Sequence, residues 1–361
     1  MMICLFVGIA LVTLCWTIYY KRNWSKAISI SLEFEQKAVY EGEQVSMLES
    51  ITNEKRLPVP ILETTIQMNK ELIFEDMKNA RISDFTNKRD VFSMLGYQKI
   101  TRRLFVDCTK RGYYEINQLY CNTRSLLYTK SYSEQKEVKA SLFVYPKRVD
   151  VSDIDVKCEK IAGNLQCEKR LYEDPFAFCA IREYRITDSM KAINWKASAK
   201  TGDLMVNTFE STLAPKVMIY LDLQDRSIMP EDDLNEMGIS VAATLAQRLI
   251  RNGMEVGIGV SGEEKNERLE PASGSIQLER IEKMLSIVKQ GEKVKDFVAI
   301  LRDLPKDAVP VFISKNIQNQ EEIERFLGRR QEGIWVIPCW NKIQKLEHSQ
   351  NLHIITKFVK K

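Results

Sequence analysis

The sequence contains few of the side chains from which active sites are most often built. It has two histidines, His348 and His353, in 361 residues, and its eight cysteines form no Cys-x-x-Cys pair. A structural zinc site is therefore not expected, because such a site needs several clustered Cys or His ligands. The scattered cysteines instead predict free thiols in a reducing compartment.

The sequence also lacks a phosphate-binding loop, since no G-x-x-x-x-G-K-[ST] motif occurs in it. Gly257, Gly259 and Gly262 match the dinucleotide-binding pattern G-x-G-x-x-G as text. A phosphate cradle, however, needs these glycines at the turn into a helix. Here the first two lie in an apolar alternation and the third precedes Glu-Glu-Lys, so we interpret the segment as a strand and a turn and expect no cofactor.

Neither sign of charge is in large excess, because 53 Lys and Arg stand against 49 Asp and Glu. A dedicated nucleic-acid binder would concentrate unpaired basic residues on one face. Basic and aromatic residues do lie close together in Arg102-Arg-Leu-Phe and in Lys110-Arg-Gly-Tyr-Tyr. Proteins that bind single-stranded nucleic acids also show this pattern. We interpret both stretches as exposed strand faces and predict no nucleic-acid partner.

Charged side chains are absent from the first 20 residues. An apolar helix of that length, rising ~1.5 Å per residue, would span the ~30 Å core of a bilayer. Aromatic residues stand at the expected interfacial depth, and basic residues follow the apolar run; they are Trp16, Tyr19, Tyr20 and Trp24, and Lys21, Arg22 and Lys26.

A cleaved signal peptide carries its basic residues before the apolar run, which is the reverse of the order here. The sequence therefore predicts an uncleaved transmembrane anchor over residues 1–22, in contact with the lipid bilayer through residues 1–20. Basic flanks favour the cytoplasm, so we expect a single-pass protein of the cell membrane with the bulk of the chain cytoplasmic.

Hydrophobic periodicity divides the remaining chain into regions of different character. Residues 27–147 alternate apolar and polar side chains in short runs, which predicts an antiparallel β-sandwich-like domain. Within residues 216–361, continuous apolar runs such as 217–223 alternate with amphipathic stretches such as 232–252, which predicts a doubly wound α/β domain. The predicted fold class is α+β multidomain, with the transmembrane helix at its N-terminus.

The region between the two domains, residues 148–215, concentrates charged and aromatic side chains. We predict a structural or docking cluster formed by Arg182, Glu183, Tyr184, Asp188, Asn194, Trp195, Lys196 and Lys200.

Local spacing suggests how these residues are used. Asp188 is placed to be a helix N-cap, and Lys191 and Trp195, four residues apart, would share a helix face. Arg182 and Glu183 could form a buried ion pair with Lys196 or Lys200.

The same cluster has an enzymatic interpretation, in which Glu183 and Asp188 act as a carboxylate pair of a hydrolase. No activating His, nucleophile elbow or metal cluster accompanies them in the sequence. The neighbouring basic residues would also lower the pKa of both carboxyls and keep them ionised. We therefore favour a non-enzymatic role and keep the hydrolase as an alternative.

Several unlike motifs occur in the order found in the family called domain of unknown function 58, which the chain resembles from about residue 27 to its C-terminus. They are Val39-Tyr-Glu-Gly-Glu, Asn53 with Leu57-Pro-Val-Pro, Lys110-Arg-Gly-Tyr-Tyr, Val144-Tyr-Pro, Arg182-Glu-Tyr, Asp188 and Ile193-Asn-Trp-Lys-Ala-Ser-Ala-Lys. The resemblance implies membrane segments, a β domain, a von Willebrand factor A-like region and a MoxR-type AAA ATPase as partner. This chain departs from the family in having one membrane segment instead of two, and in the sequence Ser189-Met-Lys-Ala before Ile193.

The von Willebrand factor A resemblance raises the question of a metal site. That fold can bind Mg²⁺ through Asp-x-Ser-x-Ser, which supplies hard oxygen ligands. Here the register reads Asp222-Leu-Gln224-Asp225-Arg226, and Arg226 would bring a positive charge to the metal position. Ser314-Lys-Asn follows the later strand in place of an acidic ligand. We favour a metal-free version, with Asp222 and Asp225 as weak candidate ligands.

Taken together, these features predict a membrane-anchored, non-enzymatic interaction or assembly protein that is a partner of a MoxR-type AAA ATPase. The alternatives are a divalent-metal-dependent adhesion module using Asp222 and Asp225, and the hydrolase using Glu183 and Asp188.

Overall fold

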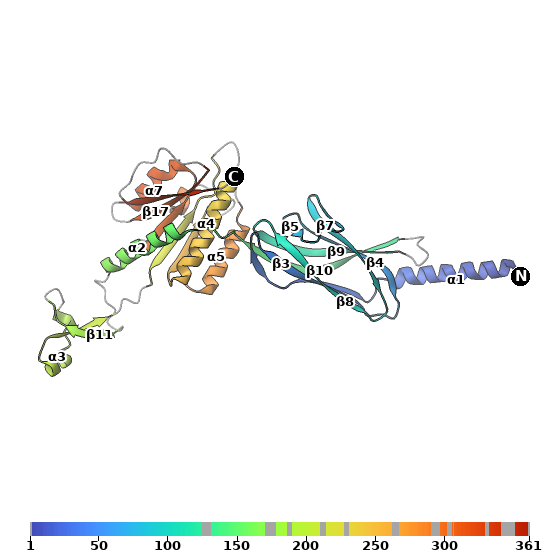
Figure 1. The fold of residues 1–361 in the computed structure, drawn as a ribbon, viewed down its shortest axis with the longest axis horizontal. Helices are drawn as coiled ribbons and strands as arrows, with labels where there is room; N and C mark the ends of the chain where they lie inside the picture. Colours follow the sequence, from blue (N-terminus) through green and yellow to red (C-terminus); the bar gives the residue numbers. More distant parts are fainter. Residues whose placement is uncertain are drawn as a thin grey trace. The chain divides into compact units, whose positions relative to one another are not determined.

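The computed structural model describes residues 2–124, 131–169, 178–185, 190–209, 214–226, 231–261, 267–289, 297–301, 305, 307–328, 332–340 and 351–359 (Figure 1). The chain divides into two compact units. The first comprises Met1–Arg148 with Glu282–Val288, and the second comprises Val149–Ile281 with Lys289–Lys361.

Two β-sheets make up most of the first unit. The smaller sheet is antiparallel and has the order β1 (Ile28–Phe34), β3 (Gln44–Asn53), β8 (Lys99–Cys108) and β5 (Leu72–Phe74). The larger has the order β2 (Ala38–Tyr40), β10 (Ser131–Tyr145), β9 (Gly112–Arg124), β4 (Val59–Asn69), β7 (Phe85–Met94) and β6 (Ala80–Ile82). Its pairs are antiparallel except for β2 with β10.

Alternation along each strand places every second side chain in a common core. Met47 and Val106 of the smaller sheet and Leu62, Ile66 and Leu119 of the larger one are all fully buried in a single cluster. This is the two-sheet arrangement that the period-two pattern of residues 27–147 predicts.

The prediction of a transmembrane anchor over residues 1–22 is wrong, and with it the fold class as predicted. Residues Met2–Asn23 do form a helix, α1, but none of the helices in the described part of the chain has the length and apolar character needed to cross a bilayer. Tyr20 and Trp24, which the sequence placed at a membrane interface, are buried in the core of the β unit. The hydroxyl oxygens of Tyr20 and Thr123 lie 3.4 Å apart. The end of the apolar stretch thus packs against protein.

A buried charge network connects the two sheets of the first unit. Arg102 of β8 forms ion pairs with Glu49 of β3 in its own sheet and, at 2.6 Å, with Asp90 of β7 in the other sheet. The hydroxyl of Thr64 on β4 donates to the Glu49 carboxylate at 3.4 Å. The Glu49 side chain is completely buried. Such a carboxylate is tolerated because donors from both sheets surround it.

Lys55 ties the segment after α1 to the loop that follows β3. Its ammonium donates to the backbone carbonyls of Trp24 at 2.6 Å and Lys26 at 2.9 Å. Burial and, to a smaller extent, the nearby Lys136 ammonium lower the pKa of Lys55 from its ordinary 10.5 to about 8. Folding therefore makes the Lys55 ammonium release its proton at a lower pH than in the unfolded chain.

A six-stranded sheet forms the centre of the second unit. Its order is β15 (Glu267–Ala272), β14 (Glu255–Val260), β13 (Lys216–Leu221), β16 (Ala308–Ile313), β17 (Gly333–Cys339) and β18 (Leu352–Phe358), and β15 alone is antiparallel to its neighbour. The described residues around this sheet include the helices α2 (Ser152–Lys169), α4 (Asp232–Arg251), α5 (Ser275–Ile287), α6 (Val298–Leu301) and α7 (Gln320–Leu327).

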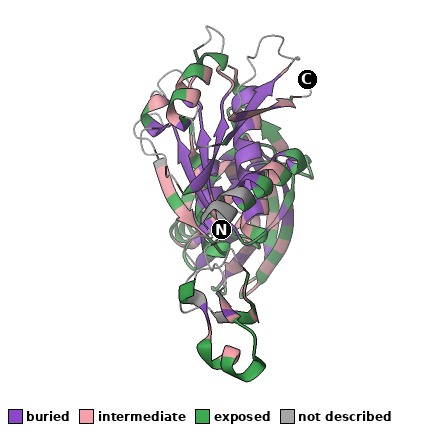
Figure 2. Ribbon diagram, turned by 90° about the vertical axis from the view of Figure 1, so that its left-hand side faces the viewer, coloured by how far each residue is buried: buried purple, intermediate pink, exposed green. Residues whose placement is uncertain are grey.

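Helices cover both faces of this sheet, which explains why its central strands are apolar without alternation. On one face, Met218 and Tyr220 of β13 share a core cluster with residues of α6 and α7. On the other, a Cβ added at Gly238 of α4 would lie 3.4 Å from the side chains of Leu221 and Ile313. Figure 2 shows the central strands of this sheet coloured as buried.

Glycines in β14 are required by packing. A Cβ at Gly257 would lie 2.6 Å from the Met218 sulfur and 2.8 Å from the Leu269 carbonyl oxygen. Gly257 and Gly259 both lie within the strand, as predicted, and Gly262 lies outside the described residues.

The cysteines Cys15, Cys108, Cys121, Cys158 and Cys339 are free, which confirms the prediction of free thiols for these five. Burial raises the pKa of Cys108 and of Cys121 to about 12, so both are uncharged thiols at neutral pH.

The charge network predicts that Glu49→Ala is strongly destabilising. The substitution removes one carboxylate from the partly buried guanidinium of Arg102 and should lower the free energy of unfolding by about 2–3 kcal/mol. Urea denaturation measures this change. Glu33→Ala, on the exposed face of β1, is the control and should change stability by less than about 0.5 kcal/mol. Equal urea midpoints for the two variants would contradict a structural role for the network.

The lowered pKa of Lys55 predicts a pH dependence. Between about pH 8 and 10.5 the unfolded chain holds a proton on Lys55 that the folded chain has released, so the contribution of this residue to stability rises with pH. In Lys55→Met this increment should vanish. The measurement is the difference in unfolding free energy between wild type and variant at a series of pH values, and a constant difference across this window would refute the assignment.

Candidate functional site

The first candidate surface is the signature lobe, defined as residues 178–185 and 190–209. Strands β11 (Phe178–Glu183) and β12 (Met205–Phe209) form an antiparallel pair, in which Arg182 faces Val206 and Glu183 faces Met205. The backbone N–H of Tyr184 donates to the carbonyl of Leu204 at 2.8 Å. Between the strands lie the 3₁₀ turn η1 (Met190–Ala192) and the helix α3 (Trp195–Thr201).

Asn194 organises this lobe. Its side-chain oxygen accepts from the Ala197 N–H at 3.0 Å, which makes it the N-cap of α3. Its side-chain nitrogen donates to the Asn207 amide oxygen at 2.7 Å, and its own N–H donates to the Met205 carbonyl at 2.8 Å. The helix ends after Thr201, where Gly202 adopts a φ of 86°. One side chain thus both starts α3 and ties it to β12.

The structure differs from some of the details predicted for the cluster, and one predicted detail lies outside the described residues. The N-cap of the described helix is Asn194, whereas Asp188, the predicted cap, lies outside the described residues. Lys191 belongs to η1 and Trp195 to α3, so they do not share the face of one helix. Arg182 donates to the Glu183 carbonyl at 3.0 Å. In the described part of the chain no ion pair joins Glu183 to Lys196 or Lys200.

The outward surface of the lobe is apolar and basic. Trp195, at the first position of α3, has 66% of its surface exposed. Met190 and Leu204 are exposed large hydrophobic residues as well. Lys196 and Lys200 are also exposed. A Trp left this open, on a helix that is capped at both ends, is typical of a contact surface.

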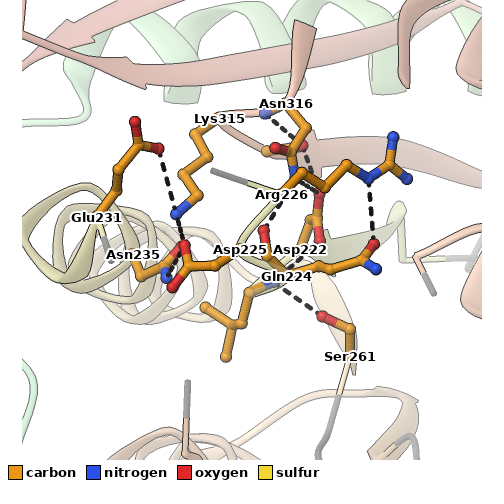
Figure 3. A network of polar contacts seen from close by, with 11 residues as sticks. Asp222, Gln224, Asp225, Arg226, Glu231, Asn235, Ser261, Lys315 and Asn316 are labelled. Atoms are coloured by element: carbon orange, nitrogen blue, oxygen red, sulfur yellow. Dashed lines mark hydrogen bonds and ion pairs between the residues drawn. The ribbon is translucent and has the colours of Figure 1, made fainter. Parts of the chain in front are cut away.

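The second candidate is the switch-point cluster, defined as Asp222, Gln224, Asp225, Glu231, Asn235, Ser261, Ser314, Lys315, Asn316 and Asn319. Figure 3 labels all of these residues except Ser314 and Asn319. These side chains follow or face the carboxyl ends of β13, β14 and β16. Because β14 and β16 lie on opposite sides of β13, the strand order reverses direction there. Open α/β sheets bind ligands at this kind of position.

Asp222 holds the loops of this edge together. One carboxylate oxygen accepts from the Ser314 hydroxyl at 2.7 Å and from the side-chain amides of Asn316 and Asn319 at 2.8 and 2.9 Å. The other accepts from the N–H of Gln224 at 3.0 Å. Asp222 is 3% exposed, so these hydrogen bonds replace its hydration.

Asp225 forms an ion pair with a buried lysine, Lys315. The ammonium of Lys315 forms an ion pair with one carboxylate oxygen of Asp225 and lies 3.4 Å from the Glu231 carboxylate. The side-chain amide of Asn235, in the first turn of α4, donates to the same Asp225 oxygen at 3.3 Å. The sequence assigned the positive charge here to Arg226, but the Arg226 guanidinium is exposed and donates to the Gln224 side chain at 3.3 Å.

This arrangement does not fit a divalent ion. Both oxygens of Asp222 accept hydrogen bonds from protein groups, and Asp225 is paired with Lys315. In the part of the chain that is described, no three His, Cys, Asp or Glu side chains are grouped to hold a metal. Lys315 and the three asparagines were not among the predicted site residues. The available signal was the run of polar residues directly after each buried strand, at 222–225 and 314–316.

A family model matches part of the chain. Residues 180–338 match the model of the family described as "Protein of unknown function DUF58", which confirms the predicted resemblance over a stretch that contains almost all of the signature lobe and the whole switch-point cluster. The uncharacterised protein YeaD of Bacillus subtilis (strain 168) is 21% identical over 242 residues, which are 67% of this chain and 58% of that protein. The chain thus aligns with less than two thirds of this relative.

Among solved structures, the chain is similar to the seventh ScaB type I cohesin of Pseudobacteroides cellulosolvens, with 8% identity over 33% of this chain and 94% of that chain and a TM-score of 0.21. It is also similar to a non-cellulosomal cohesin of Archaeoglobus fulgidus, with 9% identity over 36% of this chain and 97% of that chain and a TM-score of 0.22. Likenesses at these scores carry no argument about function.

The contacts of Asp222 predict that Asp222→Ala disturbs the whole edge of the sheet. The substitution removes the acceptor that Ser314, Asn316 and Asn319 share and should lower the unfolding free energy by about 3 kcal/mol. Urea denaturation gives the magnitude, and hydrogen exchange should locate the loss of protection after β16. The control is Asp307→Ala, because Asp307 pairs with Lys216 at 3.0 Å in a partly exposed ion pair worth about 0–1 kcal/mol. A loss no greater than the control's would contradict this role of Asp222.

Proposed function

We propose that the protein is a non-enzymatic interaction protein that docks a protein partner on its signature lobe. The observation that supports this most directly is Trp195, 66% exposed at the start of a helix that Asn194 ties to β12. The partner that we propose is a MoxR-type AAA ATPase. This identification rests on the resemblance to the family described above, not on the geometry of the lobe.

Physical chemistry favours Trp195 as the energetic centre of such an interface. Tryptophan is among the residues that contribute most to protein–protein binding, because its large rigid surface is buried with little loss of conformational freedom. A capped helix lowers the entropic cost of binding further, since α3 needs no additional ordering. Met190 and Leu204 would widen the apolar contact.

The charge of the lobe indicates the partner's complementary surface. Lys196 and Lys200 are both exposed and lie on the same short helix as Trp195. Basic residues at the rim of an interface steer association with an acidic surface and make it sensitive to salt. We therefore expect an apolar pocket for Trp195 with acidic residues beside it.

We also infer that residues 216–361 form a von Willebrand factor A-like domain. The strand order β15-β14-β13-β16-β17-β18 supports this, because it is a doubly wound 3-2-1-4-5-6 order with helices on both faces. Such a domain would serve here as a scaffold for the signature lobe and the loops of the sheet edge.

Trp195→Ala should weaken binding to a purified MoxR-type ATPase by about 30-fold, which corresponds to about 2 kcal/mol. The thermal midpoint should stay unchanged, because the side chain is largely exposed. Fluorescence anisotropy with the labelled protein measures the affinity, and raising the salt concentration should weaken wild-type binding.

Two variants make this experiment decisive. Ile276→Ala removes an equally exposed apolar side chain, 67% exposed on α5, and should bind like wild type. Asn194→Ala keeps Trp195 but removes the cap of α3 and its hydrogen bond to Asn207 of β12, so it should lose part of the affinity. A Trp195→Ala variant with wild-type affinity would reject the docking surface, and a wild-type protein that does not bind the ATPase would reject this partner.

A further inference from the structure

Lys315 is buried in a way that is unusual for a lysine. Its side chain is 3% exposed and that of its partner Asp225 is 2% exposed. The second carboxylate near it, that of Glu231, is 28% exposed and lies 3.4 Å away. A flexible, strongly hydrated ammonium is rarely buried to this extent, because desolvation is costly unless acidic groups compensate it.

The two carboxylates reach Lys315 from different elements. Asp225 stands in the loop after β13, and Glu231 is the N-cap position of α4. Lys315 comes from the loop after β16, 90 residues from Asp225 in the sequence. Without a cation between them, two carboxylates this close to one point would repel each other in an environment of low polarity.

Unpartnered oxygens beside the pair show that this is more than a simple ion pair. The second carboxylate oxygen of Asp225 and the amide oxygen of Asn235 are buried and receive no hydrogen bond within the described residues. Asn235 itself is 2% exposed. Together with the Glu231 carboxylate, the cluster offers more oxygen acceptors than Lys315 alone can satisfy. Hard oxygen ligands in this number are what a divalent cation would use.

We propose that the Lys315 ammonium is a covalently tethered substitute for a divalent cation at the switch point of the sheet. The site holds its cation permanently, so the loops after β13 and β16 keep their arrangement at any concentration of free Mg²⁺. Asp225, Glu231 and Asn235 are the groups that would bind a divalent ion if the ammonium were removed. This inference does not depend on partner binding at the signature lobe.

Lys315→Ala tests this directly. Thermal unfolding is followed for wild type and variant in EDTA and at MgCl₂ concentrations rising to about 10 mM. This range includes the dissociation constants of weak protein sites for divalent ions. The wild-type midpoint should not respond to either condition. The variant should melt about 5–10 °C lower in EDTA, because one partner of a buried pair is missing, and MgCl₂ should restore at least half of that loss in a saturable manner.

Lys216→Ala is the matched control. Lys216 is the first residue of β13, the strand that Asp225 follows, and lies at the end of the strand away from the cluster. It pairs with Asp307 in a partly exposed ion pair. Its removal should neither lower the midpoint by more than about 2 °C nor create a response to Mg²⁺. A Lys315→Ala variant that melts like wild type, or that is no more sensitive to Mg²⁺ than Lys216→Ala, overturns the proposal.

A measurement on the wild-type chain covers the case in which Lys315→Ala does not fold. Mn²⁺ titrated into the wild type and followed by its electron paramagnetic resonance signal should stay unbound at millimolar metal. The double variant Asp225→Asn with Lys315→Met removes both charges at similar volume and should fold without responding to Mg²⁺. Mn²⁺ bound by the wild type and displaced by Mg²⁺, or a Mg²⁺-dependent double variant, overturns the proposal.

Discussion

The buried carboxylate of Asp222 is the constraint on which the arrangement of the α/β sheet edge depends. A carboxylate taken out of water must recover its hydrogen bonds, and here four protein donors supply them. Three of the four come from the segment after β16, so satisfying one side chain determines the course of a loop more than 90 residues away. Lys315 lies in that same segment, so the course of this loop also places its ammonium next to Asp225.

The first unit also satisfies a buried carboxylate, but with different donors. Glu49 is as buried as Asp222, but its main partner is the guanidinium of Arg102, which also pairs with Asp90 of the other sheet. The planar guanidinium of Arg102 pairs with its two carboxylates through separate N–H groups, whereas the compact ammonium of Lys315 faces Asp225 and Glu231 as a single charged centre. In both units charge is buried between elements, where it specifies which loops or sheets come together.

Periodicity predicted much of the fold, because strands and helices are decided by residues close in sequence. The alternation in residues 28–34 and the apolar run of 217–223 correspond to β1 and to β13 with the buried Leu223. The predictions that were wrong or missed depended on distant contacts. Tyr20 looked like a membrane-interface residue until Thr123 and the β core were placed around it. Asn194 becomes a cap only with β12 beside it, and Lys315 was found only when the strand order brought β16 next to β13.

Trp195 and Lys315 show how the two candidate sites differ in the free energy that they can offer to a binding partner. Trp195 leaves most of its apolar surface in water, so the free energy of burying it is still available to a partner. Lys315 has already exchanged its hydration for Asp225 and Glu231, so its interaction energy is spent on holding the chain's own loops. A partner would gain little from approaching a charge that is already neutralised. The signature lobe is therefore suited to recognition, while the switch-point cluster is suited to maintaining the scaffold.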